Sequence, residues 1–252
     1  MKTFEILAVL GALAWIYPLA VLLRNILSRT KIEILNHKEL EVGFTTNGPI
    51  VNMDVAFSSR NKDAFVKSVS IKLEHENKEN LELKWEWFEE VLMELDIPDS
   101  GIVPYRKNQK AIAIKVPTGT LVEKKIGFQN RKFKSEYSKI FSDTNQKQIN
   151  ISDNDQNIEQ LKTSNEYNDF LNLFKNHFPW KKGKYSGVIK VEIAERKKVF
   201  TQDFSFELTT LDIKNLELNI TTCQKLVEMH FVKLDKEFKT VWKWAQPFDL
   251  EK

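Results

Sequence analysis

The chain has 252 residues, and its 38 Lys and Arg nearly balance its 35 Asp and Glu, which leaves a formal charge of +3. A dedicated nucleic-acid-binding domain is usually clearly basic, so this balance argues against a nucleic-acid partner. Seventeen Phe and six Trp against eight Gly are typical of a packed globular protein rather than a disordered one. The single cysteine, Cys223, excludes an intramolecular disulfide framework.

The N-terminal segment is the most apolar part of the chain. No charged residue occurs between residues 6 and 23, a run that would span about 27 Å as a helix, close to the roughly 30 Å hydrocarbon core of a bilayer. No small-residue cleavage pattern follows it, which favours a retained anchor over a cleaved signal peptide. Residues 1–30 are therefore expected to form one transmembrane helix with a basic flank. The side chains expected to mark the span are Ile6, Leu10, Leu13, Trp15, Leu19 and Leu23.

Positive charge follows this segment and is nearly missing before it. Arg24, Arg29 and Lys31 come after the apolar run, whereas Lys2 alone comes before it. Lys and Arg near the ends of a span favour the cytoplasmic side. We therefore expect a single-pass membrane protein with its body in the cytoplasm. An extracytoplasmic body with the opposite orientation is the alternative.

Alternating apolar residues dominate residues 31–128 and return at 188–208, as in strands with one buried face. One such run is Leu81, Leu83, Trp85 and Trp87. Turn signals separate the runs, and residues 117–119 are read as a hairpin turn between two short strands. About eight or nine short strands without crossover helices predict a mainly β fold, with an antiparallel immunoglobulin-like β-sandwich over residues 31–209.

An insertion interrupts this pattern at about residues 129–183. Its Asn- and Gln-rich tract, residues 142–157, is expected to be a loop. A helix should follow, capped by Ser164 and ended by Pro179. The apolar stripe that predicts this helix consists of Tyr167, Phe170, Leu171, Phe174 and Phe178.

The last part of the chain, residues 210–252, changes to a helical period. Thr209 and Asp212 resemble a capping arrangement at its start. The stripe that follows is Ile213, Leu216, Ile220, Cys223, Val227, His230 and Leu234. Packing on the chain's own sandwich is the favoured interpretation, and homo-oligomerisation through this helix is the alternative. The pattern leaves open whether residues 235–252 form a helix or a strand.

Sequence motifs for catalysis or metal binding are missing. No glycine-rich phosphate loop, nucleophile elbow or closely spaced histidine pair occurs, so no catalytic residue, cofactor or metal is expected. Cys223 lies on an apolar stripe and is interpreted as a buried hydrophobic residue. Basic clusters such as Lys124-Lys125 and residues 196–198 suit anionic lipid headgroups, although ordinary solvated surface is the favoured interpretation.

Aromatic and acidic residues are densest at residues 85–90. A pocket for a cation or a base would use such groups, so this segment is a candidate ligand surface. The candidate residues are Trp85, Glu86, Trp87 and Glu89. The favoured interpretation is simpler, with both tryptophans in the core and the acids facing water.

These observations favour a non-catalytic interaction or scaffold protein. It would present a β-sandwich binding surface to a protein partner at the membrane. One alternative is a membrane-tethered hydrolase or transferase with a carboxylate and aromatic site. The other is an extracytoplasmic envelope protein of the same fold.

Overall fold

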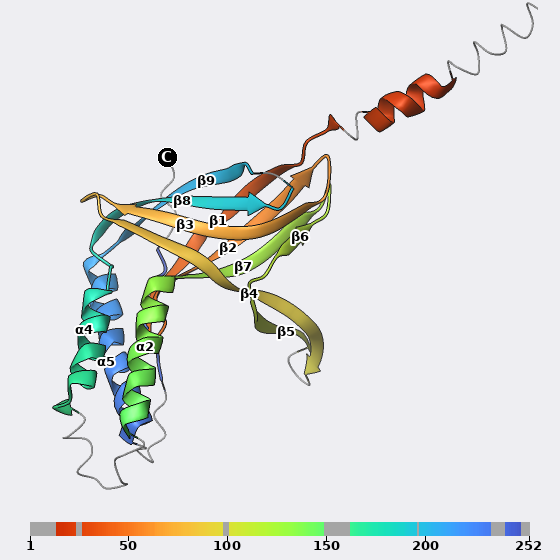
Figure 1. Cartoon of the computed structure of the whole chain (residues 1–252). Helices are drawn as coiled ribbons and strands as arrows, with labels where there is room; N and C mark the ends of the chain where they lie inside the picture. Colours follow the sequence, from red (N-terminus) through yellow and green to blue (C-terminus); the bar gives the residue numbers. More distant parts are fainter. Residues whose placement is uncertain are drawn as a thin grey trace, which may run out of the picture.

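The computed structural model describes residues 14–23, 27–97, 101–148, 162–195, 197–232 and 240–247. Its body is one antiparallel sheet of nine strands with a group of helices at one end (Figure 1). The strands are β1 (Lys31–Thr45), β2 (Gly48–Arg60), β3 (Ala64–His75), β4 (Asn80–Ile97), β5 (Gly101–Lys110), β6 (Ile114–Val116), β7 (Leu121–Gln129), β8 (Gly183–Ile193) and β9 (Val199–Leu208). The helices of the body are α2 (Arg131–Gln148), α4 (Asn165–Asn176) and α5 (Thr210–Val232).

The sheet is strongly curved and nearly closed. Its main path runs β1-β2-β7-β4-β3-β8-β9, with β5 paired to β4 and β6 paired to β3. Every pairing between these strands is antiparallel. The two end strands of the path, β1 and β9, contact each other. The twist of a large sheet therefore almost closes it around its own interior.

The prediction of a mainly β antiparallel fold is confirmed, but the strands do not divide into the two sheets of a sandwich. Alternation shows only that each strand buries one face, and it does not distinguish a second facing sheet from the curl of one sheet. Here the inner face of the single sheet forms the core. Fully buried side chains come from both halves of the path, for example Val42, Val51, Ile71 and Phe206.

Residues 117–119 form a turn, but not the predicted hairpin. Gly119 has a φ of 76°, a left-handed conformation that favours glycine. The strand before the turn, β6, pairs with β3, whereas the strand after it, β7, pairs with β2 and β4. The turn therefore carries the chain across the sheet instead of joining neighbours.

Aromatic rings hold the helices together. The ring centroids of Tyr137 in α2 and Phe170 in α4 are 5.6 Å apart, and those of Phe170 and Phe231 in α5 are 5.8 Å apart. Ser164 caps α4 as predicted, because its hydroxyl accepts a hydrogen bond from the Tyr167 N–H. The insertion and the C-terminal helix thus form one helical layer at the end of the sheet (Figure 1).

The loop predicted from residue 142 is wrong over its first part, because residues 142–148 belong to α2. The polar composition of this tract concealed the stripe of Phe133, Tyr137, Ile140, Phe141 and Thr144, which continues a helical spacing into it. Asn130 accepts a hydrogen bond from the Phe133 N–H at the start of the helix. The rest of the tract, from 149 to 157, lies outside the described residues.

Helix α5 begins as predicted and packs on its own chain. The Thr209 hydroxyl accepts a hydrogen bond from the Asp212 N–H, and the Asp212 carboxylate accepts one from the Thr209 N–H. Leu216, Cys223 and Val227 of the predicted stripe are buried, and α5 contacts β1 and α4. Homo-oligomerisation through this helix stays a prediction, and Leu234 lies outside the described residues.

Residues 14–23 are helical and lead away from the sheet (Figure 1). Trp15 and Tyr17 are largely exposed there. In the described part of the chain, no helix is both long enough and apolar enough to cross a membrane. Residues 6–13 of the predicted span and Arg24 of its flank lie outside the described residues, so the anchor stays a prediction.

Candidate functional site

The alternation of buried and outward-facing side chains along strand β4 shifts by one residue just after Trp85. Trp85 pairs with Phe128 of β7, and Trp87 pairs with the adjacent residue, Gly127. Two steps on β4 thus match one step on β7, which is a β-bulge, and a bulge shifts the alternation of side chains by one. Trp85 is buried in the core, whereas Trp87 lies on the outer face. The prediction that both tryptophans fill the core is therefore wrong for Trp87.

Trp87 lies in a row of paired residues that crosses the outer face. The row runs from Trp87 to Gly127, then to Asn52 of β2 and Glu41 of β1. Residues directly opposite each other in an antiparallel pair point to the same face. A Cβ atom at Gly127 would overlap the indole of Trp87. Glycine at this position therefore lets the ring lie against the sheet.

The C-terminal segment, residues 240–247, brings two more tryptophans to this face. The indole of Trp244 lies on Gly43 of β1, where a Cβ atom would overlap it. Trp242 and Trp244 are both partly buried. The structure describes this segment as neither helix nor strand, apart from one bridge that pairs Ala245 with Val42.

Two sets of hydrogen bonds fix the segment in place. The Nδ2 of Asn219 donates to the carbonyl of Lys243 at 2.7 Å, and the Oδ1 of Asn219 accepts from the Lys243 N–H at 2.9 Å. Asn219 lies on α5 and is fully buried. Ala245 and Val42 exchange two backbone hydrogen bonds of 2.8 and 2.9 Å. Trp242 and Trp244 flank Lys243 in the sequence. Helix α5 holds this segment at Lys243 and β1 holds it at Ala245, so the two elements together position both tryptophans.

The three tryptophans line one hollow of about 390 Å³, which we term the Trp hollow. Its aromatic lining comes from β4 and the C-terminal segment, and its polar lining comes from five strands of the sheet. Its lining residues include Trp87, Trp242 and Trp244, with Glu41, Asn52, Glu89, Asn108, Lys125 and Gln129.

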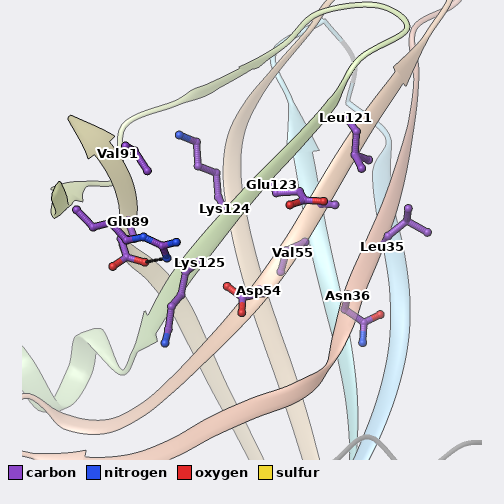
Figure 2. A pocket seen from close by; sticks show the side chains of 12 residues that line it. Leu35, Asn36, Asp54, Val55, Glu89, Val91, Leu121, Glu123, Lys124 and Lys125 are labelled. Carbon is purple, nitrogen blue, oxygen red and sulfur yellow. Dashed lines mark hydrogen bonds and ion pairs between the residues drawn. The ribbon is translucent and has the colours of Figure 1, made fainter. Parts of the chain in front are cut away.

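A second hollow, of about 560 Å³, adjoins the first and shares Glu89 and Lys125 with it. Figure 2 shows its lining side chains on β1, β2, β4 and β7, including Leu35, Asp54 and Leu121. The β4 and β5 strands extend away from the sheet beyond this point as a two-stranded arm, residues 91–97 and 101–106 (Figure 1). The two hollows together form the outer groove, which lies beside the base of the arm.

Each carboxylate of the Trp hollow is bound to a basic side chain. The Lys125 Nζ donates to one oxygen of Glu41 at 2.9 Å, and the Asn52 Nδ2 donates to the other at 3.0 Å. Arg106 donates to Glu89 at 3.3 Å. Burial alone would raise the pKa of Glu41, but the hydrogen bonds from Lys125 and Asn52 and the Lys125 charge outweigh it and hold that pKa below its usual range. Glu41 is therefore ionised at neutral pH.

Asn52 has an unusual environment. Its side chain lines the Trp hollow although the residue is only 6% exposed. Its Oδ1 is buried and has no hydrogen-bond partner among the described residues. A buried acceptor that lacks a donor costs about 1–3 kcal/mol, so a group that supplies a donor there would be stabilising.

Glu86 lies apart from the groove and connects β4 to α2. It accepts hydrogen bonds from Arg131 at 2.8 Å and Lys134 at 3.1 Å. Burial would raise the pKa of Glu86, but these two cations outweigh it and lower that pKa. Of the four candidate ligand residues, Trp87 and Glu89 therefore line the Trp hollow, Trp85 lies in the core, and Glu86 binds the helical layer.

Sequence reasoning missed most of the Trp hollow. Glu41, Asn52 and Lys125 lie far apart in the chain and meet only through the strand order β1-β2-β7. The two C-terminal tryptophans join them because their segment is bonded to α5 and β1. One signal was available, since glycine inside a strand often marks a close approach of another group. Gly43 and Gly127 are such positions.

The structure also describes the surroundings of Cys223 and of two basic clusters. Cys223 is fully buried, and burial raises the pKa of its thiol far above the ordinary value. Among the described residues, no group of three or more His, Cys, Asp or Glu side chains is arranged to hold a metal ion. Within the basic clusters, Lys124 pairs with Glu90 and Lys181 pairs with Glu79.

No protein-family model matches the chain, and no curated protein matches it. One solved structure that matches is a family 123 glycoside hydrolase from Clostridium perfringens, studied for glycolipid glycan hydrolysis. The two chains are 13% identical with a TM-score of 0.34, and the match covers 72% of this chain and 28% of that one. The present chain thus spans less than a third of that protein, and a likeness at this level carries no argument about function.

Proposed function

We propose that this chain is a non-catalytic, membrane-tethered interaction protein that binds its ligand in the outer groove. The observation that carries this proposal is the Trp hollow, where three tryptophans and a set of polar side chains converge from the sheet and the C-terminal segment. A concave surface that combines aromatic rings with a few polar groups is typical of a binding site. The bulge that turns Trp87 outward supports the same interpretation, because bulges often re-aim a side chain next to a site.

The membrane tether rests on the N-terminal segment. Trp15, Ile16, Tyr17 and Leu19 keep more than half of their surface exposed in the helix of residues 14–23. Apolar surface of this kind favours burial in a bilayer, and the sequence before it is also apolar. The basic residues Arg29 and Lys31 that follow support a cytoplasmic body.

Binding is favoured over hydrolysis by the state of the acids in the groove. A general acid at neutral pH needs a raised pKa, whereas the ion pair with Lys125 lowers the pKa of Glu41. Glu89 is held by Arg106. Both carboxylates therefore act as fixed partners of cations in this arrangement.

The arm supports a protein partner in addition to the groove ligand. Its exposed apolar side chains are Val91, Leu92, Met93, Ile102, Val103 and Tyr105. An exposed apolar surface on a projecting ribbon favours association. Charges of both signs, such as Glu94 and Lys107, flank these residues, which suits a protein surface better than lipid tails.

Site-specific photocrosslinking of the full chain in its native membranes tests this function. A photoreactive phenylalanine analogue at Leu121 lies in the groove, and the same analogue at Leu211, an exposed position on α5, is the matched control. We expect crosslinked products from position 121 that disappear when Trp87→Ala is added, and none of these products from position 211. Equal products from both positions, or none from position 121, would contradict the proposal.

The tether is tested separately by washing the same membranes with carbonate. The full chain should stay in the pellet, because an apolar helix does not depend on charge for its attachment. A chain lacking residues 1–29 should be released as a folded protein. Release of the full chain would show that the N-terminal segment is no anchor.

A further inference from the structure

We propose that the Trp hollow is a saccharide site, which takes a neutral sugar ring from a glycan chain. The ring would stack its apolar C–H face on the indoles, and its hydroxyls would bond to Asn52, Asn108 and Gln129. This inference rests on the proposed function, because it names the class of ligand that the outer groove binds.

The tryptophans have the geometry of stacking surfaces. Trp87 lies against Gly127 and Trp244 lies against Gly43, so the sheet supports one side of each indole. Both residues line the hollow and are only partly buried. A rigid indole offers a large apolar area at low entropic cost. A sugar ring, which is apolar on its C–H faces and polar at its rim, matches a flat ring bordered by hydrogen-bonding groups.

Charge in the hollow is balanced by ion pairs. The charged residues of its lining are Glu41, Glu89 and Lys125. Glu41 is paired with Lys125, and Glu89 is paired with Arg106 at the groove's other hollow. With Arg106 counted, two acids are balanced by two bases, so neither a cation nor an anion gains a net attraction from these paired charges. The hollow therefore does not call for a charged ligand.

The hydrogen-bonding groups call for a ligand that donates as well as accepts. The Oδ1 of Asn52 lacks a donor among the described residues, and the amides of Asn108 and Gln129 offer both donors and acceptors. A hydroxyl can supply either role. A proline-rich peptide, the other ligand that aromatic grooves often take, presents mostly carbonyl acceptors. The Oδ1 itself is covered, so the Asn52 amide meets the ligand only by turning and giving up its bond to the Glu41 carboxylate.

The adjoining hollow gives the ligand room to extend. It is larger than the Trp hollow, and its charged lining balances three acids, Asp54, Glu89 and Glu123, against three bases, Arg106, Lys124 and Lys125. A short oligosaccharide would lie with one unit on the indoles and the next units along this surface, where balanced charges alternate with apolar side chains. The site therefore fits a glycan chain better than a free monosaccharide.

Titration of the full chain in detergent with cellotetraose, maltotetraose and chitotetraose tests the inference, with tryptophan fluorescence and calorimetry as readouts. We expect at least one of them to bind with a Kd of about 1 mM or tighter. Trp87→Ala and Asn52→Leu should each weaken this binding at least about tenfold, since they remove the stacking surface and the acceptor. Trp15→Ala removes an exposed indole outside the hollow and should leave the binding unchanged.

Several results would overturn the saccharide assignment. They are no binding of any of the three at about 10 mM, binding that Trp87→Ala leaves intact, or Trp87-dependent binding of a proline-rich peptide or tetramethylammonium in place of the sugars. Crosslinking from position 121 separates this failure from a failure of the proposed function. If those crosslinks persist while the saccharides fail to bind, the groove binds another ligand class. If they are missing too, the groove is not a binding site.

Discussion

Trp85 and Trp87 are two residues apart on β4, yet they occupy opposite sides of the sheet. Trp85 is enclosed by the core that the curved sheet builds from its inner face. Trp87 lies on Gly127 at the outer face, beside polar side chains and the C-terminal segment. One bulge separates a ring that stabilises the fold from a ring that is available to a ligand.

The two faces differ in how their side chains are held. The inner face depends on apolar burial, and most of its residues are completely enclosed. The outer face depends on paired charges, on glycines that accept indoles, and on the backbone hydrogen bonds that join Val42 to Ala245 of the C-terminal segment. Substitutions on the inner face should therefore change stability most, whereas those on the outer face should change binding most.

The largest effect is expected from Trp85→Ala. Removing a buried indole leaves a cavity, and the free energy of unfolding should fall by about 3–5 kcal/mol. Trp87→Ala removes a partly exposed ring, and its cost should be about 1–2 kcal/mol. Urea unfolding of the two variants measures the difference. Equal losses would show that both rings belong to the core and would remove Trp87 from the site.

Asn219→Ala should have the next largest effect, about 2 kcal/mol, because it leaves two backbone groups of Lys243 without their partners. The fluorescence of Trp242 and Trp244 should shift to longer wavelength as the C-terminal segment loosens. Asn80→Ala, which removes an exposed amide bonded to a turn carbonyl, is the matched control and should cost much less. Unchanged fluorescence in Asn219→Ala would show that the bridge at Ala245 alone positions the segment.

The sequence predicts the β strands and much of the helical layer, because apolar residues recur every two residues in a strand and every three to four in a helix. The Ser164 cap and the Thr209–Asp212 box follow from local chemistry in the same way. The single curled sheet does not follow, since closure depends on which strands pair across large separations.

The candidate site is predicted only in part, for the same reason. Trp87 and Glu89 stand out in the sequence, but Glu41 and Asn52 become visible only when β1, β2 and β7 are placed in order. The β-bulge after Trp85 decides that Trp87 lies on the outer face. Nothing in the alternation of residues 81–87 signals that it ends after Trp85, although the polar and apolar order does change at Phe88.

Gly127→Ala tests how Trp87 is seated. The new Cβ atom would overlap the indole, so the ring must leave the sheet, at a cost of about 1–3 kcal/mol. In a Trp87→Ala background the same change should cost much less, because the clash is gone. A double-mutant cycle on unfolding free energies measures this coupling. Additive losses would show that Gly127 matters for the backbone and not for the ring.

Acid should weaken the contacts of Glu41 and Glu86. The pKa of each is lowered in the folded chain, so the stability that each contributes is present above the unfolded value, ordinarily 4.5, and is lost as pH falls below it. Glu86→Gln should cost about 1 kcal/mol at pH 7, since it weakens the bonds to Arg131 and Lys134. Unfolding measured between about pH 7 and pH 3 should show the variant and the unmodified protein converging. A constant difference across this range would exclude Glu86 as an acid-sensitive contact.

The smallest effect is expected on the arm. Ile102 is 70% exposed on β5, beyond the sheet, so Ile102→Ser should change the free energy of unfolding by no more than about 0.5 kcal/mol. Ile71→Ser, at a fully buried position of β3, is the matched comparison and should be severely destabilising. A large loss in Ile102→Ser would mean that the arm is covered in the folded protein, by a second copy or by another part of the chain. A small loss of unfolding free energy would show that the arm is exposed in the folded protein. Its apolar side chains would then serve contact with a partner and not the stability of the fold.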